Sequence, residues 1–235
     1  MQHIEPSSLS DLESRVSYLK AFVGFTAADA QAIHASKPVV AALVPGIVDT
    51  VYRKLLSFDI TAQSFVPRQT GYDGDAPASL KELDLEHPQI KFRMSFLRGY
   101  LVKLVTMDYE EAATWEYLDK VAIMHTGVPG FAHRAKKPSL RVEYVHMGLL
   151  LGYVMDLLLS SVIEHPDLDE QTKSAVLRGF NKVIWIQNDL FARHYVAEPT
   201  PAPKAYGMNR NILFYGVGVI AVLGWLRVSY QHWMV

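Results

Sequence analysis

The sequence predicts an all-α fold of about eight helices followed by a C-terminal transmembrane helix, and three observations support this prediction. Apolar residues recur at helical spacing in several long segments, whereas no segment alternates convincingly as a strand. Capping-box patterns, prolines and glycines mark the expected helix ends. An uncharged apolar run follows a proline-rich spacer near the C-terminus.

The composition is that of a folded protein, with 50% hydrophobic and 20% charged residues. Its 23 basic and 24 acidic side chains leave a net charge of −1, so we expect no nucleic-acid partner. The absence of cysteine excludes disulfides, thiolate zinc sites, iron–sulfur clusters and a cysteine nucleophile. The nine histidines must therefore supply any soft-metal ligand.

Two capping-box patterns predict the first helices. Residues Ser10–Glu13 (SDLE) predict a helix that ends near Phe22, and Thr26–Asp29 (TAAD) predict a second that ends near Val44, before Pro45-Gly46. A third helix follows, because five apolar residues share one helical face: Ile47, Val48, Val51, Tyr52 and Leu55.

The rest of the chain alternates between helical spacing and loops. We expect a short helical turn over 61–65 and a long loop over 67–86, which is rich in Gly, Pro and Asp. Helical spacing resumes in four further segments: 87–105, 109–126, 139–164 and 169–196.

The C-terminal segment predicts a membrane anchor. Residues 198–210 form a Pro-rich linker, and the uncharged run that follows spans about 24 Å, short of a ~30 Å bilayer core unless Arg227 snorkels. We predict a transmembrane helix over 211–231; a terminal core helix is the alternative. Lys204 and Arg210 precede the run, and no secretory signal pattern opens the sequence, so we expect the main domain in the cytosol.

His125 is the first candidate ligand. Leu118, Val121, Ala122 and His125 share one helical face, and Gly127 follows at the expected helix end, so the imidazole points inward. A lone inward histidine is more often a hydrogen-bonded core residue. Neutral imidazole is nevertheless the usual protein ligand of haem iron in proteins without thiolate ligation.

Tyr52 is the second candidate, set among apolar residues. Such a tyrosine either packs its ring and finds one partner for its hydroxyl, or donates a hydrogen bond to a bound gas such as O₂. Spacing alone leaves both interpretations open.

Two further patterns are weaker. Glu143–His146 fits half of a di-iron carboxylate site, but the only comparable pair, Asp84–His87, lies in or beside the long loop. We therefore expect His146 to be a core or pocket-lining residue. The basic residues 133–137 fit a solvated loop or a clamp for an anionic group such as a haem propionate.

Three segments together resemble the protoglobin and globin-coupled sensor family. Lys120–Gly127 (KVAIMHTG) resembles the family's proximal-histidine motif, Tyr144–Gly148 (YVHMG) the opening of its next long helix, and Val51–Leu55 (VYRKL) its distal-tyrosine helix. The resemblance covers roughly residues 9–196. An insertion around Val128–Pro138 departs from the family pattern, and so does Val51, which stands where an aromatic residue often occurs.

The resemblance implies a globin-like fold that holds haem b. His125 would be the axial iron ligand and Tyr52 the distal hydrogen-bond donor. Further residues would line the pocket: Phe92, Ser95, Phe96 and Met147. Residues 1–197 would form the haem-binding domain.

The leading hypothesis is a membrane-tethered sensor or reservoir of a diatomic gas (O₂, CO or NO) that acts through a signalling partner or as a homodimer. The alternatives are a haem enzyme of nitric oxide, nitrite or peroxide chemistry that uses an external reductant, and a cofactor-free helical scaffold. Dependence on an added reductase separates the first two, and a Soret band separates both from the third.

Overall fold

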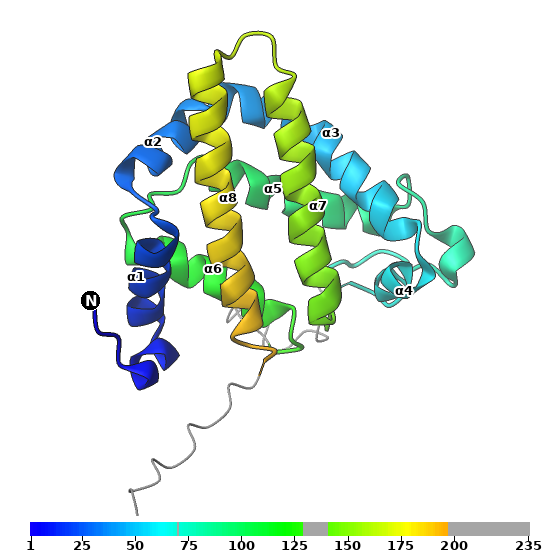
Figure 1. Cartoon of the computed structure of the whole chain (residues 1–235). Helices are drawn as coiled ribbons and strands as arrows, with labels where there is room; N and C mark the ends of the chain where they lie inside the picture. The colour runs from blue at the N-terminus through cyan, green and yellow to red at the C-terminus, as the bar shows by residue number, and fades with distance from the viewer. Residues whose placement is uncertain (70, 129–140, 197–235) are drawn as a thin grey trace, which may run out of the picture. The chain divides into compact units, whose positions relative to one another are not determined.

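Helices make up nearly all the regular structure in residues 1–69, 71–128 and 141–196, which the computed structural model describes (Figure 1). Within these ranges the α-helices are α1 (Leu12–Val23), α2 (Ala27–Ala35), α3 (Lys37–Leu56), α4 (Asp59–Ala62), α5 (Pro88–Leu104), α6 (Ala112–Met124), α7 (Tyr144–Ile163) and α8 (Glu170–Ala192). Short 3₁₀ helices lie at Pro6–Ser10, Gln63–Phe65 and Leu80–Glu82. The predicted all-α class is confirmed, and the described ranges contain no strand. The linker 198–210 and the tail 211–231 lie outside the described residues.

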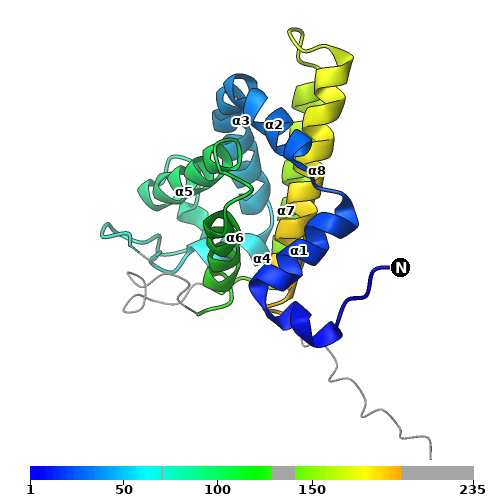
Figure 2. The same ribbon diagram turned by 90° about the vertical axis from the view of Figure 1, so that its left-hand side faces the viewer.

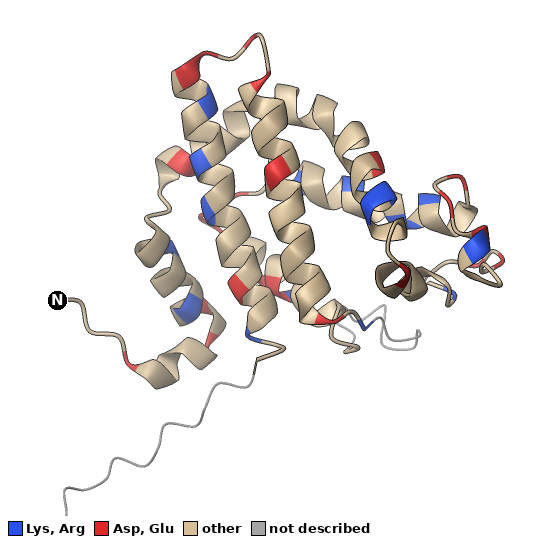
Figure 3. Cartoon of the chain, turned by 45° about the vertical axis from the view of Figure 1, so that its right-hand side comes forward, with Lys and Arg blue, Asp and Glu red and all other residues tan. Residues whose placement is uncertain are grey.

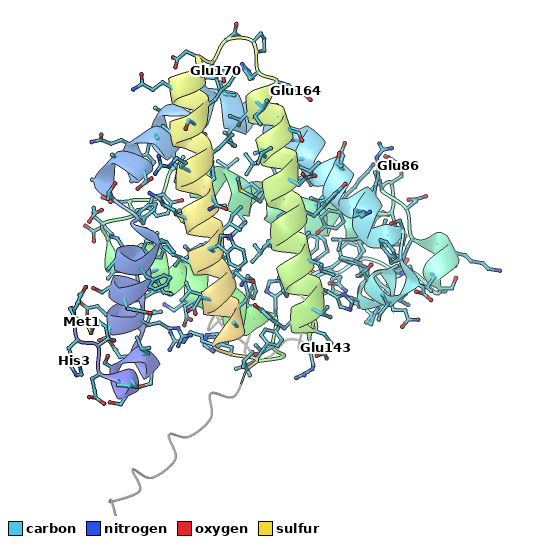
Figure 4. The ribbon with its side chains drawn as sticks, in the orientation of Figure 1. Met1, His3, Glu86, Glu143, Glu164 and Glu170 are labelled. Atoms are coloured by element: carbon cyan, nitrogen blue, oxygen red, sulfur yellow. The ribbon has the colours of Figure 1, made fainter. Side chains whose placement is uncertain are left out.

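The antiparallel pair of α7 and α8 organises the domain, which spans residues 1–196. Glu164 and Glu170 lie at one end of this pair and Glu143 at the other (Figure 4). Helix α8 also contacts α1, α2 and α6, and α3 packs against α5 and α7. Figure 2 shows α5 and α6 together on one side of the α7–α8 pair. This arrangement leaves α6, which ends next to His125, packed on α8.

A glycine lets α2 approach α8 closely. A Cβ atom at Gly179 would lie 3.0 Å from the backbone oxygen of Asp29 and 3.0 Å from Ile33 Cγ1. Such distances are shorter than normal van der Waals contact, so any larger residue would push the helices apart. The same crossing carries an ion pair, with Lys182 Nζ 2.7 Å from Asp29 Oδ1.

Both expected N-terminal helices form, but their starts differ in detail. Thr26 makes the predicted capping box, in which its backbone N–H donates to Asp29 Oδ2 at 2.8 Å. Helix α1 begins one residue later than its pattern predicts. Asp11 caps it by accepting the Ser14 N–H at 2.9 Å, and Gly24 ends it in the left-handed region at φ +66°.

The predicted helix break at Pro45-Gly46 is wrong. Helix α2 ends at Ala35, and α3 starts at Lys37 with Pro38 in its first turn, where a missing N–H costs nothing. Pro45 lies inside α3, which continues to Leu56. An internal proline costs about 3 kcal/mol. Burial of an apolar stripe on both sides of it offsets that cost: Val40, Val44, Ile47, Val48 and Val51.

Helix α7 is the one helix in the described part of the chain that is long and apolar enough to cross a membrane. It meets this criterion by length and composition only. Within the domain it packs against α3 and α8, as a core helix does. It therefore lends little support to a membrane location.

Candidate functional site

His125 occupies the C-cap of α6, as its spacing predicts. Its Nδ1 lies 2.7 Å from the backbone oxygen of Val121, one helical turn earlier. Because a carbonyl oxygen can only accept, Nδ1 carries the proton, and Nε2 becomes the nitrogen with the basic lone pair. A hydrogen bond of this kind fixes the tautomer and ring orientation that a metal-ligating histidine needs.

An aromatic side chain of α8 packs against the His125 ring. The ring of Phe191 in α8 lies 5.5 Å from the imidazole, at an interplanar angle of 70°. Phe191 belongs to a small cluster with Ala122 of α6 and Met147 of α7, and all three residues are buried. The predicted pocket residue Met147 therefore lies on the α6 side of the domain, near His125.

Polar contacts fix the helix ends around this cluster. The backbone N–H of Val142 donates to the His125 oxygen at 2.8 Å, and Val142 in turn accepts from the Tyr195 hydroxyl at 2.7 Å. Earlier in α6, the buried Asp119 lies 2.8 Å from His194 Nε2, just beyond α8. These contacts tie the end of α6 to the ends of α7 and α8 and so restrain the imidazole.

Tyr52 lies on the buried face of α3, as predicted, and is only 4% exposed. Its ring packs against Phe65, with the ring centroids 5.7 Å apart. Burial raises the pKa of Tyr52 to about 12, although the charge of Arg93 opposes the shift. The hydroxyl is therefore protonated at neutral pH and can donate a hydrogen bond.

The aromatic residues of α5 lie together, and α5 packs against α3. The rings of Phe92 and Phe96 meet edge to face at 4.9 Å, and Phe92 also contacts Tyr72 at 5.4 Å. Phe96 remains 43% exposed in the middle of its helix. A large exposed aromatic residue is a place where an apolar ligand would gain contact. Ser95 is exposed, and its hydroxyl donates to the Phe92 carbonyl at 2.7 Å.

Sequence reasoning missed three participants. The Val121 carbonyl follows from helical geometry, since it is four residues before His125. Phe191 depends on the pairing of α6 with α8, for which one sequence gives no signal. Arg93 is detectable in principle, because it lies three residues before Phe96 and so shares its helix face.

Other predictions fall outside the described residues or find no counterpart within them. The basic residues 133–137 and most of the insertion at 128–138 lie outside. Glu143 pairs with Arg141 at 3.1 Å, and the described ranges contain no group of three or more His, Asp or Glu side chains placed to hold a metal ion. The described residues thus provide no di-iron site around His146.

The residues that are present fit a haem group. They supply an imidazole with a hydrogen-bonded Nδ1, apolar and aromatic walls, and a neutral hydroxyl donor on a separate helix. In addition, the buried Nε of Arg93 has no hydrogen-bond partner among the described residues. Buried donors without a partner are uncommon in proteins, so the role of Arg93 needs an explanation.

Comparisons with known proteins identify the family and the fold. The family model described as Protoglobin matches residues 12–200. Among solved structures, the globin domain of the Geobacter sulfurreducens globin-coupled sensor matches with a TM-score of 0.54 and 17% identity, over 77% of this chain and 97% of that one. No curated protein matches the sequence. The structural likeness shows that the described domain has a globin-like fold.

Proposed function

Because the chain belongs to the protoglobin family, we propose that its globin-like domain binds one haem b through His125 and takes a diatomic gas as its ligand. Haem iron supplies the coordination position for the gas, and the protein supplies orientation, enclosure and hydrogen bonding. Gas binding is therefore the function that the family and the site together support best.

The hydrogen bond between His125 Nδ1 and the Val121 oxygen carries this proposal. It presents Nε2 as the ligating nitrogen and holds the ring against Phe191, so little conformational freedom is lost when a metal binds.

With haem bound, Tyr52 would donate a hydrogen bond to the gas, and Phe92 and Phe96 would provide apolar contacts. Met147 would add a further apolar contact near His125. These assignments follow the family resemblance, and the burial of Tyr52 and Met147 supports two of them.

A signalling role through a partner is supported by the surface of α7 and α8. Within Tyr144–Ile163, Asp156 is the one Asp, Glu, Lys or Arg residue, and the ribbon of α7 carries little charge along its length (Figure 3). Several large apolar side chains of this pair are exposed: Val145, Leu149, Leu159, Ile163 and Trp185. Such a surface suits a protein partner or a second copy, and the predicted tail at 211–231 would tether the assembly to a membrane.

Spectroscopy of the purified full chain tests the function. After haem is supplied and reduced, the account expects a Soret band that shifts reversibly with O₂ and CO, without any added reductase or turnover. Irreversible consumption of O₂ or nitric oxide that depends on a reductant would make the protein an enzyme instead. Absence of a Soret band would leave a cofactor-free scaffold.

A further inference from the structure

Arg93, on α5, differs from the other residues with buried polar side-chain atoms in the described part of the chain, because one of its donors has no hydrogen-bond partner there. Its Nε is buried, and across residues 1–69, 71–128 and 141–196 it is the one buried side-chain nitrogen or oxygen without a hydrogen-bond partner. The guanidinium stays protonated under all ordinary conditions, so the unsatisfied donor belongs to a permanent cation. Unsatisfied buried donors are few in native proteins, so each one calls for an explanation.

The neighbours of Arg93 include two residues assigned to the pocket. The guanidinium carbon is 5.7 Å from the centroid of the Phe96 ring. The same side chain lies close enough to the Tyr52 hydroxyl to oppose, through its charge and hydrogen bonding, the rise in the tyrosine pKa. Tyr52 and Phe96 are the residues assigned to the gas-binding side of the pocket, so Arg93 adds a positive charge to that side.

We propose that Arg93 is a specificity-determining residue of this pocket, whose guanidinium donates a charge-assisted hydrogen bond to the ligand and favours anionic ligands over neutral ones. This inference rests on the proposed haem function and deepens it, because it names the ligand class that the site prefers. Hydrogen bonds from a charged donor are about twice as strong as neutral ones, and an ion pair inside the domain is only weakly screened.

Tyr52 and Arg93 then have separable roles. The tyrosine is a neutral donor, so it stabilises any ligand with a polarised oxygen atom. The arginine adds charge, so its effect is greatest for ligands that carry a full negative charge, such as azide or fluoride on ferric haem. Carbon monoxide, which is neutral and weakly polar, gains little from either group.

Ligand binding to the full-length haem protein tests the proposal, with Arg93→Gln compared against Arg98→Gln. Arg98 is an exposed arginine on the same helix, so its replacement removes the same charge outside the pocket. For Arg93→Gln we expect the Kd of ferric azide and fluoride to rise about tenfold or more, while CO affinity changes by less than about twofold. Arg93→Lys should recover part of the anion affinity, and Arg98→Gln should behave as the unaltered protein.

The stability of the haem-free protein gives a second readout. Arg93→Met removes the guanidinium with its unpartnered Nε but keeps the aliphatic stem, so the urea midpoint of the haem-free domain should rise. If Arg93 is retained for packing or for a structural contact, its replacement by Met should lower the urea midpoint instead. That result would count against the proposal.

Two further outcomes would overturn it. Loss of haem affinity in Arg93→Gln, with azide and CO affected equally, would make Arg93 a clamp for a haem propionate. Unchanged anion binding would remove Arg93 from the pocket. In either case a His125-dependent Soret band would still uphold the proposed function, so failure of the inference and failure of the function are distinguishable.

Discussion

Tyr52 shows how the position of one side chain decides its role. Its hydroxyl is buried, protonated and adjacent to Arg93, so a hydrogen bond that it donates is little weakened by water. Loss of a hydrogen bond to a partly charged acceptor costs about 1.5 to 3 kcal/mol, or roughly 10- to 150-fold in equilibrium. For Tyr52→Phe we therefore expect the O₂ dissociation rate, followed by stopped flow, to rise at least several-fold, with a smaller change for CO.

Tyr109→Phe is the matched control for this experiment. Tyr109 is also fully buried, and its hydroxyl donates to the Leu104 carbonyl at 2.6 Å, away from the proposed pocket. Its replacement should lower stability and leave O₂ dissociation unchanged. Equal effects of Tyr52→Phe on O₂ and CO, or no effect on either, would place Tyr52 outside the ligand site.

At the residue scale, the sequence predicts which side chains are buried better than it predicts their partners. Helical spacing correctly places Tyr52 on the inner face of α3 and His125 at the end of α6. It could not reveal that Phe191 contacts His125 or that Arg93 lies beside Tyr52, because each contact joins helices that are distant in sequence. The assignments of these residues to haem remain predictions.

At the element scale, the crossing of α2 and α8 couples a helix cap to an ion pair. Asp29 closes the capping box of α2 and also accepts from Lys182 Nζ at 2.7 Å. Burial acts to raise the pKa of Asp29, but the hydrogen bonds from Lys182 and Thr26 outweigh it and hold the pKa below 3.8. A carboxylate with a lowered pKa stabilises the fold above its unfolded pKa and loses that contribution as the pH falls through its folded value.

Asp29→Asn should therefore reduce the free energy of unfolding at pH 7 by about 1 to 2 kcal/mol, measured by urea denaturation. The difference from the unaltered protein should begin to shrink as the pH falls below the unfolded pKa of about 3.9, and it should disappear below the lower folded pKa. Asp75→Asn, in the exposed loop before α5, is the control and should have no effect. A pH-independent loss in Asp29→Asn would show that the capping geometry matters rather than the charge.

Local sequence signals for helix starts and ends succeed at one place and fail at another. The capping box at Thr26 predicts the start of α2 correctly, because both of its hydrogen bonds are local. Pro45-Gly46 misleads, because the burial of Val44 and Val48 against the core outweighs the proline penalty. Pro38 begins α3 instead, a position that local rules also permit.

At the scale of the whole molecule, the spacing of apolar residues predicts the all-helical class, and the resemblance predicts the globin-like arrangement. The pairings of α2 with α8 and of α3 with α5 could not be derived from spacing, because any apolar stripe can pack on any other. The close approach at Gly179 selects one of these pairings, but only the folded chain shows which helix it meets.

The predicted transmembrane helix at 211–231 should anchor the protein to a membrane. We expect the full chain to sediment with membranes and to resist alkaline carbonate washing, whereas a chain that ends at Pro203 should be soluble. Arg227 should lie near the far boundary, where its side chain can snorkel. Retention of both versions in the soluble fraction would mean that the tail is not an anchor.

The haem content of His125→Ala decides whether this histidine holds the haem iron. The account predicts that the unaltered protein binds about one haem per chain, and that the variant loses the ligand-dependent Soret band while it keeps its helical circular dichroism. His165→Ala, in the turn after α7, should bind haem normally. An unchanged haem content and Soret spectrum in His125→Ala would contradict the account.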